Sequence, residues 1–254
     1  MDTYKNKMVL VTGASSGIGK AMAIDLAAAG AELILTARSQ DLLEALANEI
    51  HKNGGQAHVF SVDLSEAGSA ETLHTQITEA NLHVDILVNN AGLAARLSSI
   101  EEGSLDDWER MIDTNVKGLL YVSKVIIPQM TERQSGHIIN IGSSAGKEVY
   151  PKGNVYCASK HAVLAITEGM RIDLNPFGIK VGAVNPGLVE TEFSQVRFKG
   201  DKIADTVYKG FKALQAQDIA DIIYFVISRP YHVNIADLLV FPTAQANSTT
   251  VKKS

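Results

Sequence analysis

The sequence predicts an α/β protein of one domain, in which helices cover both faces of a doubly wound parallel sheet. Short runs rich in β-branched residues alternate with longer segments whose apolar residues recur every three or four positions. The short runs are apolar almost throughout, as expected of strands that are buried on both faces. The length of 254 residues is close to the upper limit for one hydrophobic core, so we expect a single domain over residues 1–254.

Seven of these runs are expected to be the strands of the sheet. They are Met8 to Thr12, Glu32 to Ala37, Gln56 to Val62, Asp85 to Val88, His137 to Gly142, Ile179 to Val184 and Leu238 to Phe241. Parallel pairing requires a crossover between successive strands, and the spacing of Ile18, Met22, Leu26 and Ala29 fits a crossover helix. A further helix is expected from Asp218 to Ser228.

The pattern changes toward the end of the sequence. Residues 188–215 mix charged and aromatic side chains without a strand pattern, and we interpret this segment as a flap over a substrate site. The tail from Gln245 to Ser254 is small and polar, so we expect it to fray unless a partner subunit holds it.

Composition excludes several classes of function. Lys and Arg number 23 against 28 Asp and Glu, and this net charge of −5 lacks the basic excess of a dedicated nucleic-acid binder. Cys157 is the single cysteine, so we expect no disulfide, no thiolate metal site and a reducing, cytoplasmic location. No apolar secretory stretch follows Met1, and the longest apolar runs, such as residues 222–227, fall far below the roughly 18 residues of a membrane span. No membrane partner is therefore expected.

A glycine turn joins the first predicted strand to the first predicted helix. The turn comprises Gly13, Ala14, Ser15, Ser16, Gly17, Ile18 and Gly19. Glycines let the backbone turn tightly and approach a pyrophosphate, which free amide groups and the positive end of the helix stabilise. The spacing differs from the usual dinucleotide fingerprint and from the lysine-bearing phosphate loop, so a purely structural turn is the alternative. The strand-turn-helix context favours a bound dinucleotide.

The residues after the second predicted strand indicate which dinucleotide is bound. In folds of this kind an acidic residue roughly 20 positions after the glycines grips the adenosine ribose of NAD. The corresponding residue here is Ala37, and Arg38 and Ser39 follow it. Because a guanidinium group suits the extra 2′-phosphate of NADP, we predict NADP(H). The alternative is that Arg38 is a solvated side chain at a strand end.

The ends of the third and fourth predicted strands contribute further candidate residues. Asp63, followed by Leu64, could accept a hydrogen bond from the adenine amino group or could cap the next helix. Asn90, Ala91 and Gly92 follow the fourth strand, where small residues would let the backbone lie against the ribose and nicotinamide. Ligands of open parallel sheets collect at this carboxyl edge.

Tyr156 and Lys160 form the candidate reacting centre. A spacing of four residues brings both side chains to one face of a helix, where an ammonium group would lower the pKa of the phenol and make it a usable acid or base. Ser143, at the end of the fifth predicted strand, can hold a carbonyl oxygen. Asn115 lies midway along an otherwise amphipathic helix, where asparagine is unfavourable, and this cost suggests a polar task.

Together these motifs resemble the short-chain dehydrogenase/reductase family, whose Rossmann fold is the doubly wound sheet predicted above. The matching positions are Thr12 to Gly19, Asp63, Asn89 to Gly92, Asn115, Ser143, Tyr156, Lys160 and residues 186–191. The resemblance covers essentially the whole chain. It implies an oxidoreductase acting on CH–OH groups, in which Tyr156 exchanges the proton, Ser143 steadies the substrate oxygen, Lys160 binds the nicotinamide ribose and Asn115 supports a water relay. It also implies a nicotinamide site lined by Pro186, Gly187, Val189 and Thr191.

The residues after Gly187 resemble those of one branch of the family, the NADP-dependent 3-hydroxy acid dehydrogenases, which act on serine and allo-threonine. The resemblance implies a small carboxylate substrate. Arg197 is the candidate contact for this carboxylate because an arginine can bind it through two hydrogen bonds, and Lys199 is the second choice. The alternative is that Arg197 is a solvated side chain or contacts another subunit. The unexpected charge of Arg96 leaves open whether that residue contacts the substrate instead.

Two other functions remain open, and the resemblance suggests an assembly. A broad ketone or 3-oxoacyl reductase would use the same catalytic residues. A non-catalytic NADP-binding regulator would not need Asn115, Ser143, Tyr156 and Lys160 together. The apolar helices around residues 119–127 and 162–170 exceed what one face of a sheet requires, and the family resemblance suggests a homotetramer built on them.

Overall fold

The computed structural model describes residues 4–198 and 207–253. Its main sheet has seven strands in the order β3-β2-β1-β4-β5-β6-β9, and every pairing in it is parallel. The strands are β1 Met8–Thr12, β2 Glu32–Ala37, β3 Gln56–Ser61, β4 Ile86–Asn89, β5 Gly136–Ile141, β6 Ile179–Pro186 and β9 Asp237–Val240. The predicted doubly wound parallel sheet is confirmed, and the predicted bounds of its strands differ by at most two residues.

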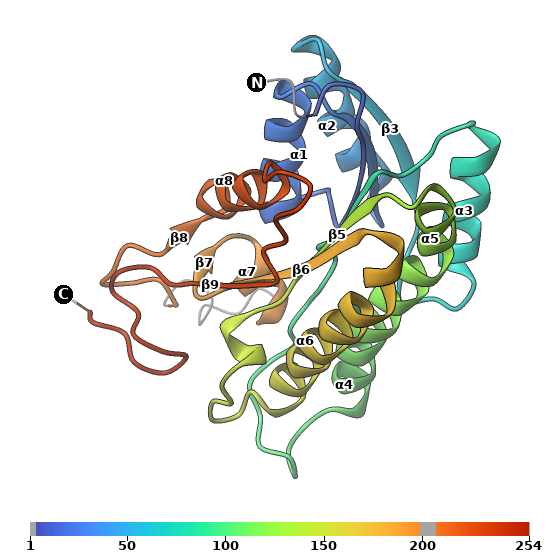
Figure 1. Cartoon of the computed structure of the whole chain (residues 1–254). Coiled ribbons are helices and arrows are strands. Elements are labelled where there is room, and N and C mark those ends of the chain that lie inside the picture. Colours follow the sequence, from blue (N-terminus) through green and yellow to red (C-terminus); the bar gives the residue numbers. More distant parts are fainter. Residues whose placement is uncertain (1–3, 199–206, 254) are drawn as a thin grey trace.

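Helices lie on both faces of this sheet (Figure 1). The α-helices are α1 Gly17–Ala28, α2 Gln40–Lys52, α3 Ser69–Glu79, α4 Leu105–Ile112, α5 Leu119–Arg133, α6 Asn154–Leu174, α7 Phe193–Arg197 and α8 Ala216–Ile227. The shorter turns are the π-helix η1 Asp113–Gly118 and the 3-10 helices η2 Ser144–Gly146 and η3 Asn175–Phe177. None of the helices in the described residues has the length and hydropathy that crossing a membrane requires.

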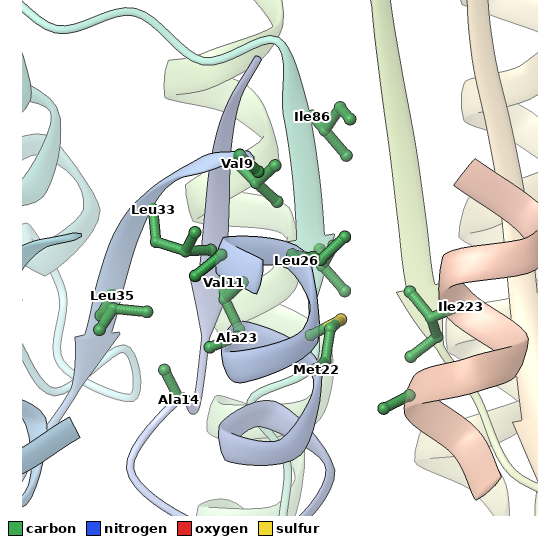
Figure 2. Close-up of a cluster of buried hydrophobic side chains, with 14 of the residues drawn as sticks. Val9, Val11, Ala14, Met22, Ala23, Leu26, Leu33, Leu35, Ile86 and Ile223 are labelled. Carbon is green, nitrogen blue, oxygen red and sulfur yellow. The ribbon is translucent and has the colours of Figure 1, made fainter. Parts of the chain in front are cut away.

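Two hydrophobic clusters fix the helices to the sheet. One cluster joins α1, α2 and α8 to one face, and Figure 2 shows Val9 and Val11 of β1 beside Leu26 of α1, with Ile223 of α8 opposite. The other cluster joins α3, α5 and α6 to the opposite face. Successive residues of β1 belong to different clusters, because side chains alternate along a strand. Burial on both faces explains why the strands are apolar throughout.

The strand order reverses beside β1, which pairs with β2 on one side and with β4 on the other. At such a point the loops that follow the two neighbouring strands diverge to opposite faces and leave a crevice at the carboxyl edge of the sheet. The glycine turn follows β1 at this edge, and residues 90–92 follow β4.

Two expectations near the C-terminus were wrong. Within residues 188–215, β7 Val189–Glu190 and β8 Leu214–Gln215 pair as a small parallel sheet, which was missed because strands of two residues carry no alternating pattern. The tail does not fray over its described residues: Gln245 pairs with Val251, and the main chain of Ala246 bonds to Thr250. Its polar side chains stabilise this turn, since Asn247 Oδ1 accepts from the amides of residues 249 and 250.

Candidate active site

A cavity of about 490 Å³ opens at the carboxyl edge of the sheet. Its walls come from the segments that follow β1, β2, β3, β4, β5 and β6, together with α6 and α7. Most residues predicted as binding or catalytic residues line it. They are Gly13, Ser15, Ser16, Gly17, Ile18, Arg38, Ser39, Asp63, Leu64, Asn90, Ala91, Gly92, Ser143, Tyr156, Lys160, Pro186, Gly187, Val189, Thr191 and Arg197. The fold thus brings together residues that are up to 184 positions apart in the sequence, from Gly13 to Arg197.

Gly19 and Asn115 are the predicted site residues that do not line this cavity. A side chain at Gly19 would place its Cβ 2.3 Å from the carbonyl oxygen of Gly13, so Gly19 lets α1 pack closely behind the turn. At Gly13 the backbone has a φ of +65°, and a Cβ would lie 2.9 Å from Cα of Ala91. Both the turn conformation and the close approach of the chain after β4 therefore require glycine at position 13.

Hydrogen bonds tie the glycine turn to the end of β4. Thr12 Oγ1 accepts from the amides of Asn90 (3.0 Å) and Ala91 (2.9 Å). The side chain of Asn90 donates to the carbonyl oxygens of Thr12 (2.9 Å) and Gly13 (3.1 Å). The Asn90 side chain therefore fixes the turn, and the cavity wall at this place is mainly backbone. Such a wall suits a ligand that is held by main-chain amides.

The N-terminus of α1 faces the same cavity. Ser16 is the N-cap, and its side chain makes no capping hydrogen bond. The first amides of an α-helix have no partner within the helix, and the helix dipole adds partial positive charge there. The main-chain amides of α1 can therefore hold a phosphate group here, even without a contribution from a lysine or arginine side chain.

Arg38 and Asp63 form the outer rim at this end. The Arg38 side chain is 60% exposed, and its Nη1 lies 4.0 Å from Asp63 Oδ2, a contact that solvent weakens. Asp63 Oδ1 accepts from the amide (3.0 Å) and hydroxyl (2.7 Å) of Ser65, so this carboxylate caps the turn after β3. Ala37 ends β2 and places no acidic side chain beside Arg38. The rim therefore carries a cation where an NAD site would carry a carboxylate.

Tyr156 and Lys160 lie on one face of α6 and are 8% and 6% exposed. Ser143 lines the same cavity, and its side chain acts on the pKa of Tyr156 as a hydrogen-bonding group. Lys160 Nζ donates to the carbonyl oxygen of Ile141 at 2.8 Å. Ser143, Tyr156 and Lys160 thus line the same cavity, as predicted from the sequence.

The pKa of Tyr156 departs from the expectation of a lowered value. Burial raises this pKa above its ordinary range, and Tyr150 adds to the rise, whereas the Ser143 hydrogen bond and the Arg197 charge act in the opposite direction. Lys160 is not among the groups that shift it, and burial lowers the pKa of Lys160 itself to about 8. The protein alone therefore keeps Tyr156 protonated.

Asn115 lies in the π-helix η1, not in the regular helix that was predicted. Its Oδ1 accepts from the amide of Leu93 (2.8 Å), and its Nδ2 donates to the carbonyl oxygen of Leu93 (2.8 Å) and to Ser159 Oγ (3.0 Å). A Cβ placed on Gly92 would lie 3.2 Å from Asn115 Oδ1 and 3.5 Å from Lys160 Nζ, so these groups meet at one point. A π-helical turn often marks a functional site, and here it turns the amide toward the chain after β4.

Gln245 supports the segment that follows β6 at the cavity wall, and it was not predicted because the sequence of the tail is polar throughout. The residue is 5% exposed, and its Oε1 accepts from the amide of Leu188 at 2.8 Å. The amide of Gly187 donates to the carbonyl oxygen of Val240 at 2.7 Å. Residues 187–189 are therefore held by β9 and by the tail.

Arg197 reaches the cavity from α7. Its Nη2 donates to the hydroxyl of Tyr150 at 3.0 Å, and its guanidinium carbon lies 5.5 Å from the ring centroid of Tyr156. Its Nε is buried and has no hydrogen-bond partner in the part of the chain that is described. Arg96 does not line this cavity, although its amide donates to the carbonyl oxygen of Arg197 at 2.8 Å. Lys199 lies outside the described residues.

A parallel sheet with a glycine turn, Tyr156 and Lys160 at one edge is typical of a dinucleotide-dependent oxidoreductase. Comparison with known proteins gives the family. The family model for short chain dehydrogenase matches residues 7–202. The chain belongs to the short-chain dehydrogenase family, as the motifs predicted.

Three similar proteins within this family have named activities. Sulfoacetaldehyde reductase 2 of Chromohalobacter salexigens is 42% identical over 241 residues, which cover 94% of this chain and 95% of the relative. NADP-dependent 3-hydroxy acid dehydrogenase YdfG of Escherichia coli (strain K12) is 40% identical over 241 residues, which cover 94% and 96%. A solved structure of serine dehydrogenase in its closed form with NADP+ has a TM-score of 0.91 and 38% identity, covering 97% of this chain and 99% of that chain.

Proposed function

We propose that this protein is an NADP(H)-dependent oxidoreductase that interconverts the hydroxyl and carbonyl forms of a short substrate bearing an acid group, such as serine, allo-threonine or another 3-hydroxy acid. The observation that carries the proposal is the grouping of Tyr156, Ser143 and Arg197 in the cavity that also holds the glycine turn. The named relatives supply the substrate class.

The described residues fit NADP(H) as cofactor. The glycine turn and the first amides of α1 would hold the pyrophosphate, and Arg38 would contact the 2′-phosphate. Asp63 and Leu64 would lie beside the adenine, Asn90, Ala91 and Gly92 beside the ribose, and Pro186, Gly187, Val189 and Thr191 beside the nicotinamide. When bound, the cofactor supplies or accepts the hydride.

The residues of the chain handle the proton and the substrate oxygen. Ser143 would donate a hydrogen bond to that oxygen, and Tyr156 would give it a proton in the reductive direction and take the proton back in oxidation. Burial raises the pKa of Tyr156, so the phenol carries its proton in the cofactor-free protein. Lys160 would contact the nicotinamide ribose, and Asn115 would hold the segment after β4 against α6 and support a water relay.

Arg197 would bind the acid group of the substrate. In a 3-hydroxy acid and in sulfoacetaldehyde, one carbon separates the reacting carbon from the acid group. A cation near the ring of Tyr156 can therefore serve either substrate, because carboxylates and sulfonates both accept several hydrogen bonds from a guanidinium group. The acid group, more than the rest of the substrate, is what this cavity is built to recognise.

Initial rates on a small panel test this proposal. NADP+ reduction is followed with L-serine, L-allo-threonine and 3-hydroxybutyrate, and NADPH oxidation with acetoacetate, sulfoacetaldehyde and ethyl acetoacetate. We expect turnover of the acids, with a higher kcat/KM for acetoacetate than for its neutral ester. A preference for the ester would favour a broad carbonyl reductase. Tight NADPH binding without turnover on any substrate would favour a non-catalytic regulator.

A homotetramer and a cytoplasmic location belong to the same proposal. Leu105, Leu120 and Ile172 are 67%, 40% and 66% exposed on α4, α5 and α6, which supports an interface along these helices. Light scattering coupled to size-exclusion chromatography would give about four times the chain mass of 27.3 kDa for a tetramer.

A further inference from the structure

Tyr150 is a cavity residue to which no role has been assigned so far. It follows η2 in the loop that leads to α6, and it lines the cavity. Its ring packs so closely on Gly153 that a Cβ there would lie 2.1 Å from Tyr150 Cε2. The same loop is closed by a hydrogen bond from the amide of Gly153 to the carbonyl oxygen of Tyr150 at 3.1 Å. The contacts with Gly153 therefore fix the position of the Tyr150 ring independently of the hydrogen bond made by its hydroxyl.

The hydroxyl of Tyr150 holds the side chain of Arg197. It accepts from Nη2 of Arg197 at 3.0 Å, and its ring centroid lies 5.6 Å from the guanidinium carbon. Burial raises the pKa of Tyr150, so the hydroxyl stays neutral beside the guanidinium charge. Within residues 4–198 and 207–253, no carboxylate forms an ion pair with Arg197. Among these residues the guanidinium charge is therefore not neutralised.

The remaining donors of Arg197 indicate what that ligand is. Its Nε–H is buried and unpartnered within the described residues, which is costly unless a bound acceptor satisfies it. The Nε and Nη2 groups share one edge of the planar fork, and this edge matches the two oxygens of a carboxylate or sulfonate. A flexible arginine side chain binds an anion more tightly when a neighbour has already ordered it.

We propose that Tyr150 is a positioning residue that sets the preference for acidic substrates by holding the Arg197 guanidinium beside the reacting centre. The inference rests on the proposed function, because it requires Arg197 to bind the acid group. Tyr150 acts through Arg197 and does not touch the reacting oxygen. Its removal should therefore change substrate choice while leaving the chemistry on neutral substrates intact.

Acetoacetate and ethyl acetoacetate form a matched pair for the test, since they share the same ketone and differ in that one bears a carboxylate and the other its uncharged ethyl ester. The kcat/KM of NADPH oxidation is measured with both for the wild type, Tyr150→Phe, Arg197→Ala and the double variant. We expect Tyr150→Phe to lower kcat/KM for acetoacetate about tenfold, mainly through KM, and to change the ester less than about twofold. Tyr150→Phe should add less than about twofold in the Arg197→Ala background, because the two residues act as one unit.

Tyr231→Phe is the matched control. Its hydroxyl donates to the carbonyl oxygen of Gly178 at 2.9 Å, and Tyr231 does not line the cavity, so neither substrate should be affected. Equal losses on acid and ester in Tyr150→Phe would overturn the proposal, as would full additivity with Arg197→Ala. Circular dichroism and NADPH fluorescence show whether each variant folds and binds the cofactor.

Failure of the proposed function is separable from failure of this inference. If the wild type reduces the ester but not acetoacetate, the acid-substrate proposal is wrong. Inhibition of ester reduction by propane-1-sulfonate then still tests Tyr150. A several-fold higher inhibition constant in Tyr150→Phe, absent in the Arg197→Ala background, would support the positioning role, and an unchanged constant would overturn it.

Discussion

The two ends of the cavity are held in different ways. At the cofactor end, the glycine turn and the chain after β4 are joined through Thr12 and Asn90 by four hydrogen bonds that involve main-chain groups. At the proposed acid end, and among the described residues, Arg197 is held by the hydrogen bond that it donates to the hydroxyl of Tyr150 and by contacts with aromatic rings. The first arrangement depends on the sheet, and the second depends on a few side chains.

This contrast suggests that the residues that bind the cofactor and those that select the substrate can be changed independently. Because the cofactor end is built from main-chain groups at strand ends, single side-chain changes there should alter the cofactor preference without moving the reacting centre. At the proposed acid end a single substitution should remove the recognition of the substrate charge. If the two ends are independent in this way, a substitution at one end should leave the property set by the other end unchanged.

Tyr156→Phe should give the largest loss, because the phenol lies between the two ends and carries the proton. We expect kcat to fall at least about a hundredfold for acid and ester alike. NADPH binding, measured by fluorescence titration, should stay within a few-fold of the wild type. Near-normal turnover would show that another group handles the proton, and a loss on the acid alone would mean that Tyr156 belongs to the acid end.

The double substitution Ala37→Asp with Arg38→Ala tests the cofactor end. A carboxylate at position 37 would repel the 2′-phosphate, and the guanidinium that binds it would be lost. We expect the ratio of kcat/KM for NADPH over NADH to fall at least about tenfold, with no change in the preference for acetoacetate over its ester. Lys20→Ala is the control, since Lys20 pairs with Glu49 at 3.5 Å and does not line the cavity. An unchanged cofactor ratio would contradict the role of Arg38.

Gln245→Ala should have a smaller effect, because its side chain supports the main chain of Leu188 and has no part in the proton transfer. The amide of Leu188 loses its acceptor, which costs about 1–2 kcal/mol of unfolding free energy. We expect KM for NADPH to rise several-fold, since residues 187–189 line the cavity. Gln245→Glu keeps the acceptor but loses the donor to the carbonyl oxygen of Asn247 and buries a charge, so it should recover only part of the loss. If both variants behave like the wild type in denaturant titrations and kinetics, the tail does not support this segment.

His137 should affect stability without affecting catalysis, because it begins β5 at the opposite edge of the sheet. Burial lowers its pKa to about 3, well below the value near 6.5 expected in the unfolded chain. The unfolded chain therefore binds the proton more readily, and the free energy of unfolding should fall by about 3 kcal/mol between pH 6.5 and 4. His137→Leu should show a shallower decline over this range. Equal slopes in urea titrations would contradict a neutral buried histidine.

The grouping of residues at the cofactor end could be predicted from the sequence to a large extent, whereas at the proposed acid end only Arg197 was predicted and its hydrogen bond with Tyr150 was not. Gly13 and Arg38 stand at fixed distances from strands whose apolar runs are visible, and the carboxyl ends of parallel strands meet at one edge. Tyr156 and Lys160 are one helical turn apart, which also makes their grouping visible. Local periodicity was sufficient for these residues.

Tyr150 and Gln245 were missed because their roles depend on contacts between distant segments. The hydrogen bond from Arg197 to Tyr150 joins residues 47 positions apart, and the one from Leu188 to Gln245 joins residues 57 apart. Neither segment has a repeating pattern. The sign of the Tyr156 pKa shift was also missed, since burial raises this pKa and Lys160, whose ammonium group bonds to Ile141, is not among the groups that shift it.

A crystal structure of the ternary complex with NADP+ and 3-hydroxybutyrate would test the central claim most directly. The account predicts that the substrate hydroxyl lies within hydrogen-bond distance of Tyr156 and Ser143, with the carboxylate on the Nε and Nη2 edge of Arg197. It also predicts that the nicotinamide lies against residues 186–191. A carboxylate that points away from Arg197, or a nicotinamide bound elsewhere, would contradict the account.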